Sequence, residues 1–259
     1  MLLSGCPSKI NYSYTNILDD KSKSDFLALL QSVNVEQASI DEYIRLVDLY
    51  NATKYPKTLK PGYSTVNAGK KIYNYTIAID CWTSGNAEME DINCRIAAFV
   101  LMKSYINMPQ SATNNKNFYL QKEIQNDFYT LSDTDILKYN AVFTTPEMRN
   151  KINFILSIKE NWDSMGLTFS VNSPIKLILV YAQFTERENF SVAHAGVLLE
   201  KDARIFFIEK TDPMLPFQVS EFTQKNELAS YLENRFNEKP FRLYILENDR
   251  SLRQGENGT

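Results

Sequence analysis

The chain has 259 residues, of which 44% are hydrophobic and 23% charged, and its formal net charge at pH 7 is −3. A chain of this length and hydrophobicity can bury a full core, so most of it is expected to fold. The near-neutral charge and the lack of a basic block argue against nucleic acid and anionic lipid as principal partners. There is no run of about 18 apolar residues, so no membrane-spanning helix is predicted.

The first residues, LLSGC at positions 2–6, resemble a bacterial lipobox, in which a cysteine is lipidated after signal cleavage. Cys6 is therefore a candidate lipidation site, and residues 1–10 are interpreted as a signal remnant and tether. The anchor would place the protein on the outer side of a bacterial cell membrane, held there only by its lipid. Met1 abuts the box, so either the biological start lies upstream or the match is accidental.

Two helices are expected in the N-terminal part of the chain. Apolar residues at helical spacing predict one behind Ser24, over residues 24–33, and another over 39–47. Ser39 and Glu42 form a capping-box pattern at the start of the second. Residues 51–71 carry two prolines and little periodicity, so a loop is expected there, whereas residues 73–82 are β-prone.

The middle of the chain predicts an apolar helix that begins at Cys94 and ends near Pro109, and a further helix opened by Pro146. Residues 174–184 are almost continuously apolar, which indicates a central strand. Strands at 193–200 and 204–210 flank a tight polar turn and predict a hairpin.

A helix over 225–234 and a strand over 241–246 complete the predicted domain, and residues 247–259 are expected to be a disordered tail. Helices first and antiparallel strands later indicate a single α+β domain over residues 11–246.

Several familiar sites are excluded by spacing. A P-loop is absent, because Gly62 and Gly69 are too far apart and Lys71 stands where the hydroxyl residue should be. The three cysteines and one histidine lack the spacing of a zinc site, and no cofactor is expected. A carboxylate pair for glycoside hydrolysis stays open, because spacing in sequence does not give spacing in space.

Cys94 is the candidate nucleophile. Asn93 is a favourable N-cap, which places Cys94 in the first turn of its helix. The helix dipole and free backbone N–H groups there would lower the pKa of the thiol and could stabilise an oxyanion. Two alternatives stay open: a small apolar residue at a helix start, and a disulfide with Cys81.

His194 is the only histidine, so any histidine chemistry must use it. Its small neighbours, at positions 193, 195 and 196, leave room for a ring or a substrate to approach. Within reach of the thiol, it would complete a nucleophile–base pair. The alternative is an ordinary half-buried histidine.

A cysteine that starts a helix, followed much later by a histidine on an antiparallel strand, is the chain order of papain-like and NlpC-type cysteine peptidases. Those folds place a polar third group on the strand after the histidine. That strand carries Glu209 and Asp212 near its end. A register change of one residue swaps faces, so Glu209 is preferred and Asp212 kept in reserve.

Three segments, NYSYTNILDD, NCRIAAFVLMK and HAGVLLEKDARIFFIEKTDPMLPFQ, resemble a bacterial lipoprotein family classed as a domain of unknown function, number forty-three hundred. The resemblance runs from about residue 11 to 246 and brings no established activity. It implies that Asn93, Cys94, Arg95, His194 and the segment carrying Glu209 belong to the family's signature.

One departure from papain-like enzymes concerns the oxyanion. Those enzymes usually carry a glutamine a few residues before the nucleophile, whereas Glu88, Met89, Glu90 and Asp91 stand here. Asn93 or backbone N–H groups would have to substitute for it. The acidic cluster also opposes thiolate formation unless Arg95 offsets it.

Two functions are therefore predicted as alternatives. The first is an extracytoplasmic thiol hydrolase or transferase acting on amide bonds, with Cys94 as nucleophile, His194 as base and then acid, and Glu209 as orienter. Its anchor would make cell-wall peptide the nearest substrate. The second is a non-enzymatic surface lipoprotein that binds peptide or carbohydrate in the groove where the enzyme would bind its substrate. The aromatic residues, 12% of the chain, would suit such contacts.

Overall fold

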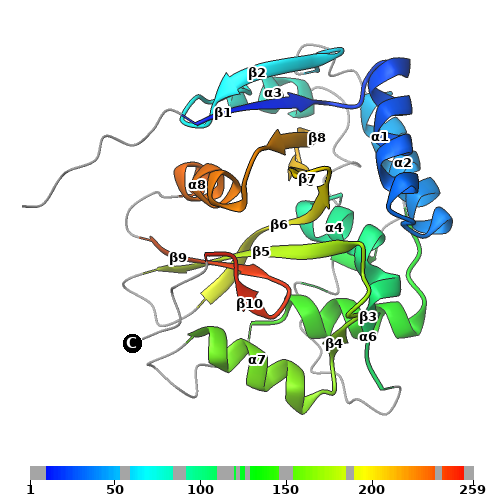
Figure 1. Cartoon of the computed structure of the whole chain (residues 1–259), viewed down its shortest axis with the longest axis vertical. Coiled ribbons are helices and arrows are strands. Elements are labelled where there is room, and N and C mark those ends of the chain that lie inside the picture. The colour runs from blue at the N-terminus through cyan, green and yellow to red at the C-terminus, as the bar shows by residue number, and fades with distance from the viewer. Residues whose placement is uncertain are drawn as a thin grey trace, which may run out of the picture.

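The computed structural model describes residues 10–52, 59–83, 92–109, 120, 123–125, 129–145, 154–184, 190–236 and 241–253. These residues form an α+β fold with seven α-helices and an eight-stranded antiparallel sheet (Figure 1), so the α+β class predicted from the sequence is confirmed. The helices are α1 (Asp20–Ser32), α2 (Gln37–Asn51), α3 (Tyr75–Thr83), α4 (Cys94–Met102), α6 (Asp133–Phe143), α7 (Phe154–Ser164) and α8 (Lys225–Phe236). The strands are β1 (Asn11–Thr15), β2 (Tyr63–Asn67), β3 (Ile106–Asn107), β4 (Thr168–Phe169), β5 (Ile175–Phe184), β6 (Phe190–Lys201), β7 (Arg204–Asp212), β8 (Leu215–Phe222), β9 (Phe241–Glu247) and β10 (Arg250–Ser251).

The large sheet has the strand order β10-β9-β5-β6-β7-β8-β1-β2, and β3 and β4 form a separate pair. The apolar strand β5 lies inside the sheet, between β9 and β6, as predicted. The predicted β6–β7 hairpin is confirmed as well. Its turn residues Asp202 and Ala203 have φ values of +50° and +58°, the conformation of the tight turns that match strand twist.

The two faces of the sheet carry different helices (Figure 1). Helix α4 packs on β5, β6 and β7 from one side, and α2 packs behind it. Helix α8 packs on β7, β8 and β9 from the other side. Alternate residues of β5 point into the two cores accordingly: Leu177 and Leu179 face α4, whereas Ile178 and Val180 face α8.

A β-bulge interrupts the β5–β6 pairing in the middle of the sheet. Val180 pairs with His194, but the next residue, Tyr181, pairs with Val192, so Ala193 is an extra residue on β6. Val192 and Ala195 therefore belong to the same core, on the α4 side, although they are three residues apart.

Several N-terminal expectations were wrong in detail. Helix α1 starts before Ser24, because Asp19 caps it by accepting a hydrogen bond from the Ser22 N–H at 3.0 Å. Ser39 is not an N-cap and forms no capping box with Glu42, since it is buried inside α2.

Two segments changed type. The expected loop over 51–71 contains β2, which is held as a strand by its pairing with β1. The β-prone segment 73–82 is mostly the helix α3. Asn74 accounts for this, because its side chain accepts hydrogen bonds from the N–H groups of Thr76 and Ile77, which starts a helix locally.

The C-terminal segment also differs from expectation. Helix α8 and strand β9 confirm the last predicted elements, but the chain then forms β10 rather than a disordered tail from residue 247. Asn248 ties this turn to β5 through two bonds with the backbone of Leu177, at 2.7 and 2.8 Å. The expected start of a helix at Pro146 lies outside the described residues, which resume with α7.

Candidate functional site

Cys94 begins α4, as predicted from its N-cap. The Asn93 side chain accepts a hydrogen bond from the Ile96 N–H at 3.1 Å, which fixes the first turn. Cys94 is a free thiol, 7% exposed, so the disulfide with Cys81 that the sequence left open does not form.

His194 meets Cys94 from the neighbouring strand. The thiol lies close enough to the imidazole for each group to shift the pKa of the other, and the backbone N–H of Ala195 also acts on the thiol. The other side of the ring meets Glu209, with 2.6 Å between Nε2 and Oε2. The structure thus brings together all three residues that the sequence singled out.

Glu209 determines which ring nitrogen carries the proton. Its burial raises the pKa of the carboxyl group, but the charge of Arg235 and the interactions with His194 and Tyr231 together outweigh burial and bring the pKa to about 2. An ionised carboxylate can only accept, so Nε2–H of His194 donates to it. Nδ1 is then the ring nitrogen that remains available to the thiol.

The pKa of the Cys94 thiol is lowered from its ordinary value of 9.0. Burial acts against this, since a buried thiolate loses its hydration. The interactions with His194, the charge of Arg95 and the Ala195 N–H all lower the pKa, and together they outweigh burial. Cys94 therefore loses its proton more readily than an ordinary cysteine.

The pKa of His194 is raised above 6.5 by the reciprocal interaction. Burial lowers it, and the positive charge of Arg235 acts in the same direction. The charge of Cys94, with the hydrogen bonds to Cys94 and Glu209, outweighs both. Thiolate and imidazolium stabilise each other, as expected for a nucleophile with its base.

Helix α8 supplies a second set of contacts that sequence reasoning missed. Tyr231 donates to Glu209 Oε1 at 2.7 Å, and Arg235 donates from Nη1 to Glu209 Oε2 at 2.6 Å. The ring of Phe236 stacks on His194 with centroids 5.1 Å apart. The only signal in the sequence was the helical spacing of these residues, which is equally typical of an ordinary packed helix.

A buried polar chain extends from Glu209 along the α8 side of the sheet. Gln218, which pairs with Glu209 across β7 and β8, lies with its Nε2 3.5 Å from Oε1 of that carboxylate. Its own Oε1 accepts from the Tyr73 hydroxyl at 2.6 Å, and Asn16 donates to that hydroxyl at 2.6 Å. These contacts satisfy polar groups that would otherwise be costly to bury.

Arg95 lies beside the thiol and joins the two elements of the pair. Its Nη1 donates to the carbonyl of Val192 on β6 at 3.1 Å, while Nε and Nη2 bind the carboxylate of Glu123. Tyr139 donates to the same carboxylate at 2.7 Å. Arg95 therefore connects the first turn of α4 to the strand that carries the histidine.

The remaining predicted residues lie elsewhere. Asp212 ends β7, accepts from the Met214 N–H at 3.1 Å and binds the Tyr75 hydroxyl, so the structure does not bring it to the ring. The space beside Gly196 is not open to a substrate, because the Phe207 ring fills it: an added Cβ would lie 2.4 Å from that ring. Cys6 and the segment 88–91 lie outside the described residues.

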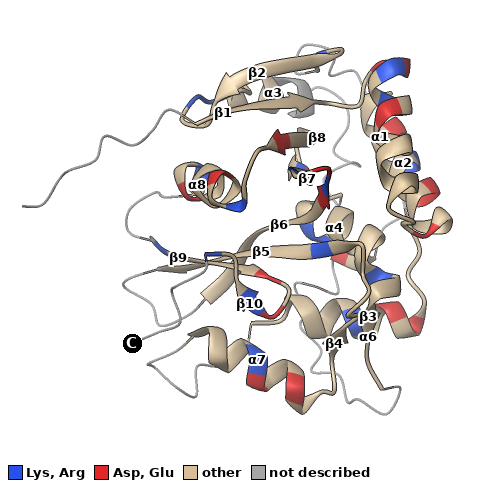
Figure 2. Cartoon of the chain, viewed as in Figure 1, with Lys and Arg blue, Asp and Glu red and all other residues tan. Residues whose placement is uncertain are grey.

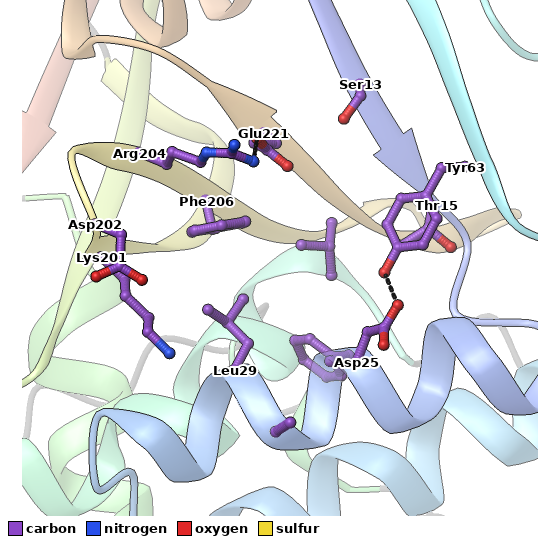
Figure 3. A pocket seen from close by; sticks show the side chains of 13 residues that line it. Ser13, Thr15, Asp25, Leu29, Tyr63, Lys201, Asp202, Arg204, Phe206 and Glu221 are labelled. Carbon is purple, nitrogen blue, oxygen red and sulfur yellow. Dashed lines mark hydrogen bonds and ion pairs between the residues drawn. The ribbon is translucent and has the colours of Figure 1, made fainter.

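A hollow of about 570 Å³ lies apart from these residues, between α1 and the sheet (Figure 3). Leu29 and Phe206 form part of its apolar lining, and Tyr63, Lys201 and Arg204 are among the polar residues around it. Neither Cys94 nor His194 lines it.

Charges elsewhere are mixed. Figure 2 shows acidic and basic residues interspersed on α1 and α7, whereas the ribbons of β5 and β6 are mostly uncharged. Within the described ranges, no three His, Cys, Asp or Glu side chains are grouped to hold a metal ion. None of the helices described is long and apolar enough to cross a membrane.

The fold and the cluster define an α+β protein in which a buried cysteine, histidine and glutamate are in contact. A family model described as a domain of unknown function, DUF4300, matches residues 13–252, and the chain belongs to this family. Neither a curated protein nor a solved structure matches the chain significantly.

Proposed function

We propose that the protein is a thiol hydrolase or transferase that acts on amide bonds through Cys94 and His194. The single observation that carries this proposal is the continuous contact from thiol to imidazole to ionised carboxylate. Structural cysteines in apolar cores are inert and have raised pKa values, whereas the pKa of Cys94 is lowered.

The geometry supports a defined division of roles. The Cys94 thiolate attacks the carbonyl carbon of the substrate, and a bond from Sγ to that carbon forms as the carbonyl becomes an oxyanion. His194 then gives its proton to the leaving amine. Water or an acceptor amine attacks the thioester, with His194 as base, and releases Cys94. Glu209 keeps the imidazole oriented throughout.

The first turn of α4 supports stabilisation of the oxyanion. Asn93 caps the helix through Oδ1, which accepts a hydrogen bond and cannot donate one, so only its Nδ2 could replace the glutamine donor. Backbone N–H groups of the turn are the better candidates, since they need no side chain and carry the positive end of the helix dipole.

The proposal has three more specific parts: a papain-like or NlpC-type arrangement, a lipid anchor at Cys6 and a cell-wall peptide substrate. The order of the cysteine helix, the histidine strand and the carboxylate strand in the chain supports the arrangement. The anchor would place the site next to the peptide of the bacterial envelope, which is the amide-rich polymer nearest to such a membrane.

The test is the rate of alkylation of Cys94 by iodoacetamide between pH 5 and 9, followed by peptide mass spectrometry on a full-length Cys6→Ser variant. We expect an apparent pKa below 9.0, because the ion pair with His194 retains the thiolate as the pH falls. His194→Ala should raise that pKa and slow alkylation at pH 7 about tenfold or more. Cys81 in the same sample serves as the internal comparison.

Equal and slow labelling of Cys94 with and without His194 would remove the basis for a nucleophile. If Cys94 is activated, peptide and amide libraries are the next substrates, and Cys94→Ser should abolish turnover. Alkylation that depends on His194 without any turnover would leave a reactive thiol without hydrolase activity, and so contradict the proposal.

The hollow beside α1 supports a second candidate function, non-catalytic binding. It combines an apolar lining with Tyr63, which is 51% exposed, and with charged side chains of both signs. Such surfaces suit peptide or carbohydrate. Titration with cell-wall peptides and glycans, in parallel on Tyr63→Ala and Cys94→Ser, tests it: binding lost only in the first variant would favour this function.

A further inference from the structure

Arg235 is the one cation that contacts the Glu209 carboxylate from α8. It donates from Nη1 to Oε2, the oxygen that also accepts from His194, at 2.6 Å. Its Nη2 binds the carbonyl of Thr211, two residues further along β7. The two terminal nitrogens of the planar guanidinium thus bind two different groups of β7. The single ammonium of a lysine cannot reproduce this geometry.

The charges of this group require such a partner. The Glu209 side chain is 0% exposed, and an unpaired carboxylate at that depth would be strongly disfavoured. With no cation beside it, the carboxylate would draw the imidazole proton toward itself. Arg235, whose side chain is 23% exposed, neutralises the carboxylate from the solvent side.

We propose that Arg235 is a positioning residue that keeps Glu209 ionised and fixed, and thereby sets which nitrogen of His194 carries the proton and how readily the ring releases it. Arg235 touches neither the thiol nor the reacting atoms in this arrangement, and it acts on the ring through Glu209 and through its own charge. The inference deepens the proposed function, on which it rests for its catalytic meaning.

The other groups around the cluster do not supply this charge. The titratable and charged residues that face it are Cys94 and Arg95 from α4, Tyr12 from β1, Tyr43 from α2, Tyr73 before α3, Lys210 from β7 and Tyr231 from α8. Lys210 donates to the carbonyls of Pro213 and Leu215 and lies 3.7 Å from the centre of the Tyr50 ring, so its amine is engaged away from Glu209.

The chain has a single histidine, which gives this inference a direct readout. In protein labelled with ¹⁵N-histidine, long-range ¹H–¹⁵N NMR spectra report the tautomer and the pKa of His194 alone. We expect the neutral ring to carry its proton on Nε2 and the pKa to lie above 6.5. Arg235→Gln, which keeps a donor and removes the charge, should raise that pKa further, by about one unit.

The direction of the shift separates this role from a structural one. Loosening of α8 would expose the ring and move its pKa down toward 6.5, whereas loss of the positive charge moves it up. Arg235→Lys retains the charge and should stay within about half a unit of the parent protein. An unchanged or lowered pKa in folded Arg235→Gln would overturn the inference.

Arg253→Met is the matched control, because Arg253 forms an ion pair with Glu233 on the same helix and touches neither Glu209 nor His194. It should leave the His194 pKa unchanged. If Arg235→Gln does not fold, Arg235→Lys decides the matter: a pKa near that of the parent supports the role of charge, and a fall toward 6.5 contradicts it.

These measurements need neither substrate nor alkylation. Suppose that Cys94 is reactive in a way that depends on His194, but that the His194 pKa does not change in the Arg235 variants. This result would contradict the inference and leave the proposed function intact. The reverse result, an inert Cys94 with a His194 pKa governed by Arg235, would sink the proposed function alone.

Discussion

Two arginine–glutamate pairs flank the thiol and the imidazole, and they are built alike. Arg95 binds Glu123, a tyrosine hydroxyl donates to the carboxylate, and the guanidinium also binds a carbonyl of β6. Arg235 binds Glu209 in the same way: the hydroxyl of Tyr231 donates to the carboxylate, and the guanidinium also binds a carbonyl of β7.

The difference lies in what else the carboxylate touches. Glu209 also accepts from His194 and has no exposed side-chain surface, whereas the Glu123 side chain is 19% exposed and donors from Arg95 and Tyr139 bind it. The Arg95–Glu123 pair thus holds α4 against β6. The Arg235–Glu209 pair contacts His194 and so influences the protonation of its ring. Similar ion pairs can fix geometry in one place and charge state in another.

The largest effect expected from this comparison is on stability. Arg235→Met leaves a fully buried carboxylate without its cation and should cost about 3–5 kcal/mol of unfolding free energy. Arg95→Met leaves Glu123 with partial access to water and should cost less, about 1–3 kcal/mol. Urea unfolding monitored by circular dichroism gives both values, and equal losses would break the distinction between the two pairs.

A smaller effect on stability is expected from the N-cap of α4, the helix that carries Cys94. Asn93→Ala removes the cap of α4 and should cost about 0.5–2 kcal/mol. It should also slow alkylation of Cys94, since the first turn no longer holds the thiol in place. Ser132→Ala is the matched control, because Ser132 caps α6 in the same way through the Asp135 N–H. Slower alkylation in both variants would point to general loosening instead.

The smallest effect concerns an ion pair away from the cluster. Arg253 and Glu233 have side chains 40% and 38% exposed, so Arg253→Met should change the unfolding free energy by at most about 1 kcal/mol. A larger loss of unfolding free energy in the same urea experiment would mean that solvent exposure does not predict how much these ion pairs contribute to stability. The comparison of the pairs would then need another basis.

The proximity of Cys94, His194 and Glu209 was more predictable than the fold around them. Cys94, His194 and Glu209 could be selected because a helix cap, a lone histidine and a hairpin are local patterns that constrain where side chains meet. Arg235 and Tyr231 could not be selected, because their role depends on the docking of α8 on the sheet, which no local pattern specifies. Two of these contacts cross more than twenty residues of chain.

The fold shows the same limit. The β6–β7 hairpin was predictable from its turn, whereas α3 was not, since the side chain of Asn74 overrides the β-prone residues that follow it. Strand β2 at the edge of the sheet was also missed, because its residues alternate only between exposed and half-buried and leave little periodic signal.

The bulge at Ala193 lies directly beside the base and separates it in the chain from two apolar residues of β6. His194 faces α8 while Phe190 and Val192 face α4, although even spacing would place all three on one side. Deleting Ala193 would make Val192 and His194 consecutive residues, which point to opposite faces of a regular strand, as they do now. A bulge bends its strand and re-aims the side chain beside it, so the extra residue acts on the direction of the His194 ring and not on the face that the ring occupies.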